Sequence, residues 1–226
     1  MRSRQAYINQ MRSYIGARDG NAKHKEIIDT YNSYLPHPRG HVLTINDAWC
    51  AATTSAAAIA LGYTDIIPIE CSCGKILEIA KQRGIWQERD DYKPAPGDLI
   101  LFDWEDNGVG DCVGAPNHIG AVEKTEDGFI YCIEGNNGAT VGECKRTRYK
   151  INNKYIRGFV CPRYDAESVP TEPAETDEPI YYVVKPGDNL TRIAIAYNTT
   201  VDAIMLLNPQ IKNKNLIYSG QTIRVK

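Results

Sequence analysis

A proline-rich acidic segment divides this chain of 226 residues into two parts of different character. Residues 166–180 contain three prolines, five acidic residues and no basic residue. Such a composition buries no apolar core and repels itself, which is typical of an extended linker. The segment therefore predicts a domain over residues 1–165, a linker over residues 166–180 and a small module over residues 181–226.

The charge of the chain and the length of its apolar runs exclude two classes of function. The whole sequence has 26 basic and 28 acidic residues, a net charge of −2, and its C-terminal module has six basic and two acidic residues. A chain with nearly equal numbers of basic and acidic residues lacks the overall positive charge that is typical of nucleic-acid-binding proteins. The longest apolar run is far shorter than the roughly 18 residues that span a bilayer. We therefore expect neither a nucleic-acid partner nor membrane insertion.

The cysteines and the N-terminus indicate a reducing compartment. Seven cysteines, an odd number, lie at positions 50, 71, 73, 112, 132, 144 and 161. The C-x-C pair Cys71 and Cys73 has no second pair to complete a zinc site. No apolar stretch of a secretory signal follows Met1-Arg2-Ser3-Arg4-Gln5. We therefore expect mostly free thiols, in a protein made in the cytoplasm.

The domain over residues 1–165 begins with helices and continues with strands. Helices are predicted over residues 2–15, 24–34, 48–61 and 74–83. Short segments rich in β-branched and aromatic residues follow at 98–104, 117–125, 129–134, 143–150 and 155–163. This order indicates an α+β fold with an antiparallel sheet.

Cys50 is the cysteine best placed to act as a nucleophile. Asp47 precedes the Ala-rich run that Gly62 ends, and predicts an N-cap with the helix starting near Ala48. Cys50 then lies in the first turn, where unsatisfied N–H groups lower a thiol pKa from its usual value of about 8.5. Cys132 falls inside a strand and is predicted to be packed.

His118 is the histidine best placed to act as a base, because it opens a strand. Residues 126–128 suit a three-residue hairpin loop, which sets Thr125 opposite Phe129. In that register His118 faces Asn136, and Glu134 is its diagonal neighbour on the same face. The other histidines, in polar or Pro/Gly-rich segments, are expected to be solvated: His24, His37 and His41.

Cys50, His118 and Glu134 or Asn136 together match the nucleophile, base and orienting group of cysteine hydrolases. Taken alone, a cysteine at a helix start is more often a small buried hydrophobe. A single histidine on a strand is more often a satisfied surface group. The joint pattern in a compatible register favours a catalytic site.

Four short motifs resemble those of CHAP domains, the cysteine- and histidine-dependent amidohydrolases/peptidases of the papain-like class. They are Asp47-Ala48-Trp49-Cys50-Ala51, Pro96-Gly97-Asp98-Leu99-Ile100-Leu101-Phe102, Asn117-His118-Ile119-Gly120-Ala121-Val122 and Ile133-Glu134-Gly135-Asn136. The resemblance implies a papain-like fold with Cys50 as nucleophile and His118 as general base and acid. It further implies Glu134 as the orienting residue, Asn136 as an accessory polar group, and cleavage of a peptidoglycan amide bond through a thioester.

The C-terminal module resembles a LysM domain. A strand at 182–184, helices at 190–197 and 201–207, and a strand at 222–225 give the order β-α-α-β. The resemblance rests mainly on Pro186-Gly187-Asp188, Leu207-Asn208 and Gly220-Gln221-Thr222-Ile223. It implies binding of glycan that contains N-acetylglucosamine, in a groove between two loops. The groove maps onto Gly187, Asp188, Asn189 and Leu190, with Asn208, Pro209, Gln210 and Ile211 opposite.

A possible calcium loop lies in the first domain. Residues 103–108 place oxygen ligands at alternate positions with glycine sixth, as in the first half of a calcium-binding loop. The twelfth position is Gly114 rather than glutamate, so a solvated acidic loop is favoured. We expect no other cofactor or metal.

These patterns favour an endolysin-like peptidoglycan hydrolase, with bacterial peptidoglycan as the partner. A muramoyl-alanine amidase is preferred over an endopeptidase that cuts the stem peptide or cross-bridge. A non-catalytic wall-binding protein is the second alternative. A cysteine peptidase or transferase acting inside the cell would have no use for the glycan module. We expect synthesis in the bacterial cytoplasm without a signal peptide, and action on the wall after release.

Overall fold

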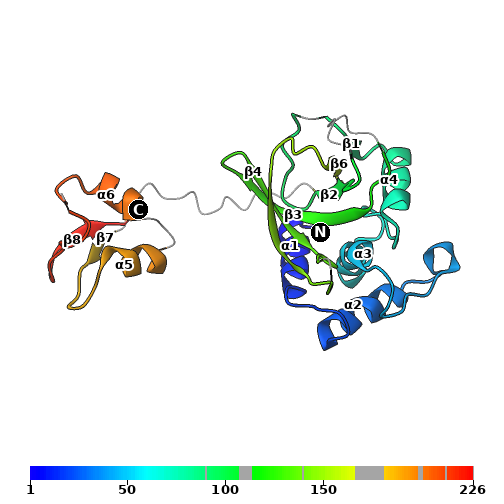
Figure 1. The fold of residues 1–226 in the computed structure, drawn as a ribbon, viewed down its shortest axis with the longest axis horizontal. Helices are drawn as coiled ribbons and strands as arrows, with labels where there is room; N and C mark the ends of the chain where they lie inside the picture. The colour runs from blue at the N-terminus through cyan, green and yellow to red at the C-terminus, as the bar shows by residue number, and fades with distance from the viewer. Residues whose placement is uncertain are drawn as a thin grey trace. The chain divides into compact units, whose positions relative to one another are not determined.

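The chain divides into two compact units, Met1–Glu167 and Ser168–Lys226, which are described separately here (Figure 1). The computed structural model describes residues 1–89, 91–106, 114–138, 140–165, 181–197, 201–211 and 213–225. The predicted linker at residues 166–180 lies outside the described residues.

Helices form the first part of the N-terminal unit. They are α1 (Arg4–Ser13), α2 (Ala22–Asn32), the 3-10 turn η1 (Pro38–Gly40), α3 (Cys50–Ala60) and α4 (Cys73–Gln82). In α1, α2 and α4 a polar side chain just before the helix accepts a backbone N–H of the first turn: Ser3, Asn21 and Ser72 respectively. These are ordinary N-caps, which satisfy amides that have no partner inside the helix.

Helix α3 begins without a side-chain cap, and the prediction that Asp47 caps it is wrong. The helix starts at Cys50 rather than near Ala48, and its N-cap position is Trp49. Asp47 Oδ2 instead accepts the backbone N–H of Thr44 at 2.7 Å and the Thr44 hydroxyl at 2.8 Å. Asp47 therefore closes the turn before the helix, and the helix N-terminus falls on Cys50 itself.

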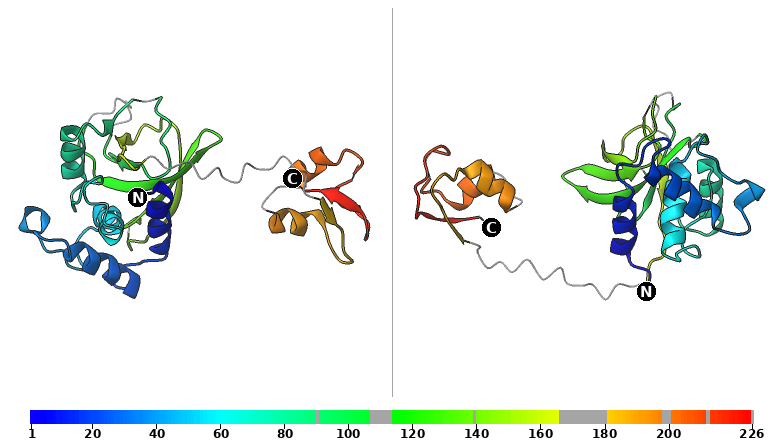
Figure 2. Two further views of the ribbon diagram at one scale, coloured as in Figure 1. Left: turned by 180° about the vertical axis from the view of Figure 1, so that it is seen from behind. Right: turned by 90° about the horizontal axis from the view of Figure 1, so that it is seen from below.

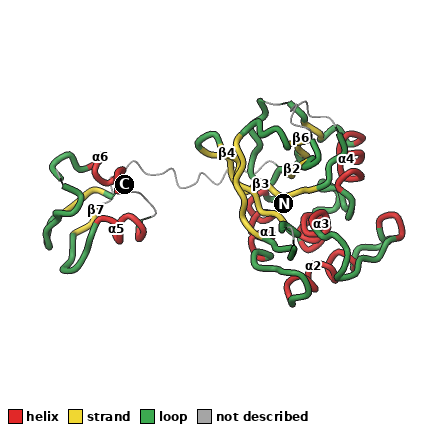
Figure 3. The backbone as a smooth tube through the Cα atoms, in the orientation of Figure 1, coloured by secondary structure: helices red, strands yellow, loops and turns green. Residues whose placement is uncertain are grey.

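A six-stranded antiparallel sheet follows the helices, which confirms the α+β fold (Figure 3). Its strands lie in the spatial order β1-β6-β2-β3-β4-β5. Their bounds are β1 (Trp86–Gln87), β2 (Leu99–Phe102), β3 (His118–Glu126), β4 (Phe129–Glu134), β5 (Lys145–Lys150) and β6 (Ile156–Val160).

The hairpin between β3 and β4 differs from the predicted one at its tip. Asp127 and Gly128 have φ values of 51° and 78°, and Glu126 pairs with Phe129, so the loop has two residues rather than three. Positive φ at both positions is typical of a tight hairpin turn that matches strand twist. An irregularity at Glu123 then shifts the register by one. Beyond it the pairing is the predicted one, because bulge and turn cancel each other.

Both faces of the sheet are covered in the N-terminal unit. Helices α1 and α3 lie side by side on one face, where they share a core with alternate strand residues (Figures 1 and 2). The opposite face has its own buried cluster, formed by Ile100, Phe102, Val122, Ile130, Cys132, Ile156 and Phe159. The run Leu99–Phe102 is therefore buried on both sides, as a central strand requires.

The C-terminal unit has the predicted β-α-α-β order. Strand β7 (Tyr181–Val183) pairs antiparallel with β8 (Thr222–Arg224), and α5 (Leu190–Ala196) and α6 (Val201–Leu207) lie between them in sequence. Asn189 caps α5 by accepting the backbone N–H of Arg192 at 2.9 Å. The unit has a core of its own: Val184, Leu190, Ile193, Ala194, Ile204, Ile211, Ile223 and Val225.

Among the helices that the structure describes, none combines the length and the apolar character that crossing a membrane needs.

Candidate functional site

Cys50 occupies the first position of α3, with 6% of its surface exposed. The backbone N–H of Ala51 hydrogen-bonds the Cys50 sulfur. Two contacts fix the residue just before it: the Trp49 carbonyl accepts the Thr53 hydroxyl at 2.8 Å, and the Trp49 indole N–H donates to Asp19 at 2.8 Å. The nucleophile candidate is therefore held on a rigid helix start.

His24 is buried, so the prediction that it is solvated is wrong. Its Nδ1 accepts the backbone N–H of Gly20 at 2.9 Å, and its ring lies 4.6 Å from the Trp49 ring. Burial lowers the pKa of His24. A neutral histidine thus packs against the residue that precedes Cys50. The residues around His24 in the sequence are hydrophilic, and they gave no sign that α2 packs against α3.

The structure brings His118 and Glu134 together on one face of the sheet. His118 Nε2 lies 2.9 Å from Glu134 Oε2, which leaves Nδ1 as the other ring nitrogen. Glu134 is fully buried and also accepts Asn137 Nδ2 at 2.5 Å, the Tyr149 hydroxyl at 3.3 Å and the Thr147 hydroxyl. A carboxylate with this many donors is fixed in place, and can hold the imidazole in one orientation.

Gly120 makes the His118–Glu134 contact possible. It lies between His118 and the register irregularity, opposite Glu134. A Cβ at this position would lie 2.5 Å from Glu134 Cγ and 3.1 Å from the Ile133 carbonyl oxygen. The Glu134 side chain therefore passes over the bare Cα of Gly120 on its way to the imidazole.

Cys50 and His118 form a coupled pair whose pKa values move in opposite directions. The Cys73 sulfur lies 3.8 Å from the Cys50 sulfur and hydrogen-bonds it. This hydrogen bond, with the contacts of His118 and the Ala51 N–H, lowers the pKa of Cys50 well below its ordinary value although burial opposes the shift. Burial alone would lower the pKa of His118, but its contacts with Cys50 and Glu134 raise it to about 9. These two directions favour a thiolate and an imidazolium over the neutral pair.

Asn136 lines the site without holding the imidazole. It has a φ of 53°, and its amide oxygen lies over Gly142, where a Cβ would be 2.2 Å away. The amide that reaches Glu134 belongs to the next residue, Asn137. Asn136 thus lines the cavity beside His118, but it does not make the contact with His118 that the extrapolated pairing suggested.

A cavity of about 450 Å³ opens beside His118. Trp104 forms one wall: its ring stacks on Phe102 with centroids 4.7 Å apart, lies 6.2 Å from the His118 ring, and is 39% exposed. The lining residues are Trp104, His118, Asn136, Asn137, Gly138 and Tyr149. The cleft therefore offers a flat aromatic surface and amide groups next to the imidazole.

Three supporting residues were missed at the sequence level. Thr147 and Tyr149 alternate along β5, so both lie on the face of Glu134, and that alternation was the available signal. Cys73 directly follows Ser72, an N-cap residue, just as Cys50 starts its own helix. Nothing in the sequence indicated that the two helix starts meet.

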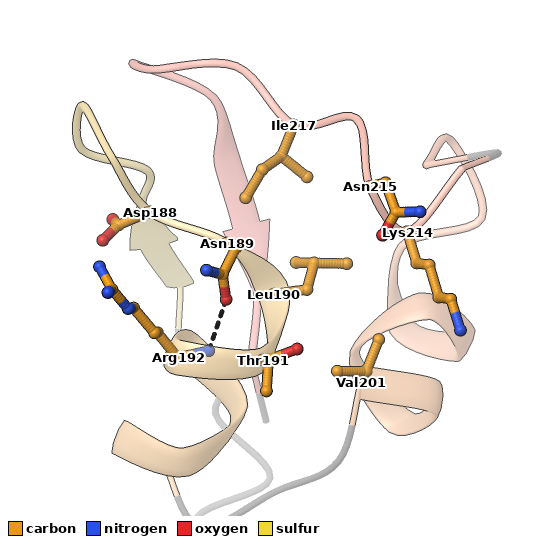
Figure 4. A pocket seen from close by; sticks show the side chains of 9 residues that line it. All are labelled: Asp188, Asn189, Leu190, Thr191, Arg192, Val201, Lys214, Asn215 and Ile217. Atoms are coloured by element: carbon orange, nitrogen blue, oxygen red, sulfur yellow. Dashed lines mark hydrogen bonds between the residues drawn. The ribbon is translucent and has the colours of Figure 1, made fainter.

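The C-terminal unit has a groove of about 890 Å³ (Figure 4). As predicted from the resemblance, Asp188, Asn189 and Leu190 line one side. Figure 4 shows Lys214, Asn215 and Ile217 across from the start of α5. The remaining lining residues are Thr191, Arg192 and Val201.

Asn208, Pro209, Gln210 and Ile211 do not belong to the described lining of this groove, and their assignment to glycan binding stays a prediction. Asn208 is buried, where its amide donates to the Ile204 and Arg224 carbonyls at 2.7 and 2.6 Å. Ile211 belongs to the core. These residues close the end of α6 onto β8, so the opposite wall begins further along the same loop. Gly187, with a φ of 86°, shapes the first loop outside the lining.

The predicted calcium loop extends beyond the described residues. Asn107 and Gly108 are not described, so the ligand pattern as a whole is untested. Asp103 Oδ1 accepts the backbone N–H of Glu105 at 3.0 Å and so closes a turn. Within the described part of the chain, no group of three or more His, Cys, Asp and Glu side chains is placed to hold a metal ion.

The described cysteines are free thiols: Cys50, Cys71, Cys73, Cys132, Cys144 and Cys161. Cys112 lies outside the described residues. Cys132 is fully buried in its strand, as predicted, and burial raises its pKa. Cys50 is thus set apart from Cys132 by its helix start and its contact with His118.

Family models match both units of the chain. A model of the CHAP domain matches residues 35–136, which include Cys50, His118, Glu134 and Asn136. A model of the LysM domain matches residues 182–226. Each match falls within one of the two compact units.

Curated relatives match only a short part of the chain. An endolysin of Bacillus phage PZA is 59% identical over 44 residues, and an endolysin of Bacillus phage B103 is 58% identical over 45 residues; each match covers 20% of this chain and 17% of the relative. A chlorophenol reductase of Desulfitobacterium hafniense is 54% identical over 46 residues, which are 20% of this chain and 14% of that protein. The chain thus spans less than a fifth of these relatives' length.

A solved structure, of a MoCVNH3 variant in complex with (N-GlcNAc)4, matches at 19% identity with a TM-score of 0.20, over 45% of this chain and 57% of that one. A TM-score this low does not establish a shared fold, so the two family models are the findings that identify the units. The chain is built from a CHAP domain followed by a LysM domain.

Proposed function

We propose that this protein is a peptidoglycan hydrolase that cleaves an amide bond with Cys50 as nucleophile and His118 as acid and base. The proposal rests on the arrangement of Cys50, His118 and Glu134. Cys50 lies at a helix N-terminus, and His118 lines an open cleft and contacts the buried carboxylate of Glu134. The CHAP match over these residues and the two phage endolysins among the relatives support it.

The geometry supports acyl transfer in two steps. The Cys50 thiolate adds to the carbonyl carbon of the scissile amide, and its oxygen gains the negative charge. The backbone N–H of Cys50 has no acceptor inside the helix, so it can stabilise that oxyanion. His118 gives its proton to the leaving amine as the C–N bond breaks and a thioester forms. His118 then takes a proton from water, which attacks the thioester and releases Cys50.

We propose the bond between N-acetylmuramic acid and L-alanine as the site of cleavage. The exposed face of Trp104 lies beside His118, and aromatic rings offer sugars an apolar surface against which C–H groups pack. Asn136 and Asn137 add amide groups that suit hydroxyl and acetamido partners. These features favour a sugar next to the scissile amide over a purely peptidic substrate.

We propose that the LysM unit binds N-acetylglucosamine-containing glycan in the groove of Figure 4. Leu190 and Ile217 provide apolar surface, and Asn215 provides donor and acceptor groups. Binding raises the local concentration of the catalytic domain at the wall. We further propose that the protein acts on the wall after release from the cell that makes it, as expected of a phage lysin.

The catalytic proposal is tested by the clearing of purified cell walls. Cys50→Ala is expected to abolish lysis. Cys161→Ala is the matched control, because it removes a thiol that contacts the Tyr92 hydroxyl at 3.2 Å instead of His118, and it is expected to lyse at the wild-type rate. Equal lysis by wild type and Cys50→Ala would leave a wall-binding protein without this chemistry.

Mass spectrometry of the digested muropeptides tests the bond. An amidase releases stem peptides with a free L-alanine amino terminus and leaves glycan strands with bare lactyl groups. New amino termini within the stem or the cross-bridge would show that the protein is an endopeptidase instead.

The groove is tested by calorimetry with N-acetylglucosamine oligomers. Ile217→Ala is expected to weaken binding, whereas Leu206→Ala, which removes an apolar side chain 83% exposed and outside the groove lining, is expected to leave affinity unchanged. Unchanged affinity in Ile217→Ala would place the glycan elsewhere.

A further inference from the structure

A second thiol lies against the proposed nucleophile. Cys73 is the first residue of α4, and its sulfur is 3.8 Å from that of Cys50, a distance at which one thiol hydrogen-bonds the other. Cys73 is buried, with 7% of its surface exposed. Ser72 caps α4 by accepting the backbone N–H of Lys75 at 3.4 Å, so the helix start that carries Cys73 is fixed.

We propose that Cys73 is a positioning residue, whose S–H donates a hydrogen bond to the Cys50 thiolate and keeps that sulfur ionised and aimed. The inference rests on the proposed role of Cys50 as nucleophile. It assigns the Cys73 thiol a part in catalysis without contact with the substrate.

Cys50 and Cys73 share one thiol proton when one of them is ionised, and the charges around the two sulfurs place that proton on Cys73. His118 from β3 faces Cys50, with Glu134 behind it, and the Ala51 N–H reaches Cys50 from α3. The hydrogen bond with Cys50, burial, and the charges of Cys50 and Cys71 raise the pKa of Cys73. Arg39, near Cys71, is held in a bidentate pair with Glu70. Cys50 therefore carries the charge, and Cys73 remains the donor.

A hydrogen bond matters here because the thiolate is nearly covered. A buried anion is costly unless donors replace the water it has lost. The Ala51 N–H and the His118 imidazolium provide two directions of approach, and Cys73 provides a third from a different helix. If Cys73 only filled space, an apolar side chain of similar size would serve equally well.

Alkylation of Cys50 as a function of pH tests the proposal. The full-length reduced protein is treated with iodoacetamide between pH 4 and 10, and modification is measured by mass spectrometry on the peptide that contains Cys50. Cys73→Ala and Cys73→Val both lack a donor. In both, we expect the alkylation midpoint of Cys50 to rise by about one pH unit, since each unit corresponds to a tenfold change in the ionisation constant.

Two controls separate donation from packing. Cys73→Ser restores a donor, and is expected to return the midpoint at least halfway to that of the wild type. Cys71→Ala removes a neighbouring thiol that does not contact Cys50, and is expected to leave the midpoint unchanged. Thermal unfolding of each variant verifies that the fold is kept, and Val fills the site if Ala does not.

Folded Cys73→Ala and Cys73→Val variants with the wild-type midpoint would overturn the proposal. So would Cys73→Ser behaving like Cys73→Ala. The acid limb of the lysis rate is expected to shift with the midpoint. The two proposals fail separately: lysis by Cys50→Ala would refute the catalytic role of Cys50, whereas the alkylation midpoints report on the thiol pair whatever the reaction.

Discussion

Cys50 shows how far single residues could be interpreted from the sequence. The Ala-rich run placed it near a helix start although the predicted cap was wrong, and strand alternation brought His118 and Glu134 to one face because that pattern is local. The contact with Cys73 was not predictable, since the two residues are 23 positions apart and meet only when α3 and α4 pack. His24 was misjudged for the same reason: its polar neighbours in sequence are not its neighbours in the fold.

The raised pKa of His118 is expected to set the alkaline limit of the proposed activity. The imidazolium is present below about pH 9 and is lost above it, so kcat/KM is expected to fall as pH rises through about 9. Glu134→Gln removes a carboxylate that favours the imidazolium, and is expected to move this limb to lower pH. Glu126→Gln, at the exposed hairpin tip, is expected to leave the limb in place. The measurement is kcat/KM on a soluble muropeptide between pH 5 and 10. An unmoved limb in Glu134→Gln would contradict the assignment.

Gly120 is expected to be intolerant of any side chain. Gly120→Ala places a Cβ within 2.5 Å of Glu134 Cγ, so Glu134 must leave His118, and activity on soluble muropeptides is expected to fall at least 100-fold, of the order seen when an orienting group is lost. Gly74→Ala, in the first turn of α4, meets only Ser72 Oγ at 3.9 Å and is expected to keep full activity. Comparable activity in both variants would contradict the close-approach role.

At the scale of elements, the sequence predicted types well and connections less well. The four helices and the later strands were expected near their observed ranges, whereas the two-residue strand β1 was missed because it is too short to show periodicity. The β3–β4 register was predicted correctly near the site although its loop was predicted wrongly, since the irregularity at Glu123 compensates. Such compensation arises from tertiary contacts and leaves no mark in a local pattern.

Glu123, at the irregularity, makes tertiary contacts with two other elements. Its carboxylate accepts Arg12 Nε of α1 at 2.6 Å and Arg146 Nε of β5 at 2.8 Å. Burial opposes ionisation, but these two guanidinium groups outweigh it and lower the pKa of Glu123. The residue therefore ties a helix to an edge strand across β3.

Glu123→Gln is expected to lower the free energy of unfolding at pH 7 by about 1–3 kcal/mol, the usual range for a lost charged hydrogen bond. Because the folded-state pKa is depressed, this stabilisation is present above the ordinary glutamate pKa and is lost as pH falls below it. Urea unfolding at pH 7 and pH 3 measures both values. Glu78→Gln, exposed on α4, is expected to change little. A difference that grows toward pH 3 would contradict the sign.

For the whole molecule, the sequence predicted a division at the acidic segment, and the boundaries drawn from it stay a prediction because residues 166–180 lie outside the described residues. Each compact unit has a separate buried core, and each core uses residues from one unit alone. In the C-terminal unit, the resemblance pointed to Asp188, Asn189 and Leu190, which line the cavity, whereas its other wall at Lys214, Asn215 and Ile217 was not expected from the sequence. The loop between α6 and β8 has no regular period, so neither propensity nor alternation could locate the second wall.

Removing the C-terminal unit is expected to separate binding from chemistry. A chain that ends at residue 165 is expected to keep its kcat/KM on soluble muropeptides within about twofold, and to clear intact walls roughly 10²-fold more slowly because the local concentration effect is lost. Parallel assays of both substrates give the comparison. An equal loss on both would show that the LysM unit supports the catalytic domain directly.

The small exposed fraction of Cys50, 6%, also limits what can trap it. A covalent inhibitor or labelling reagent is therefore expected to need a small, slender reactive group to reach this sulfur. Bulky maleimides are poorly suited to this approach.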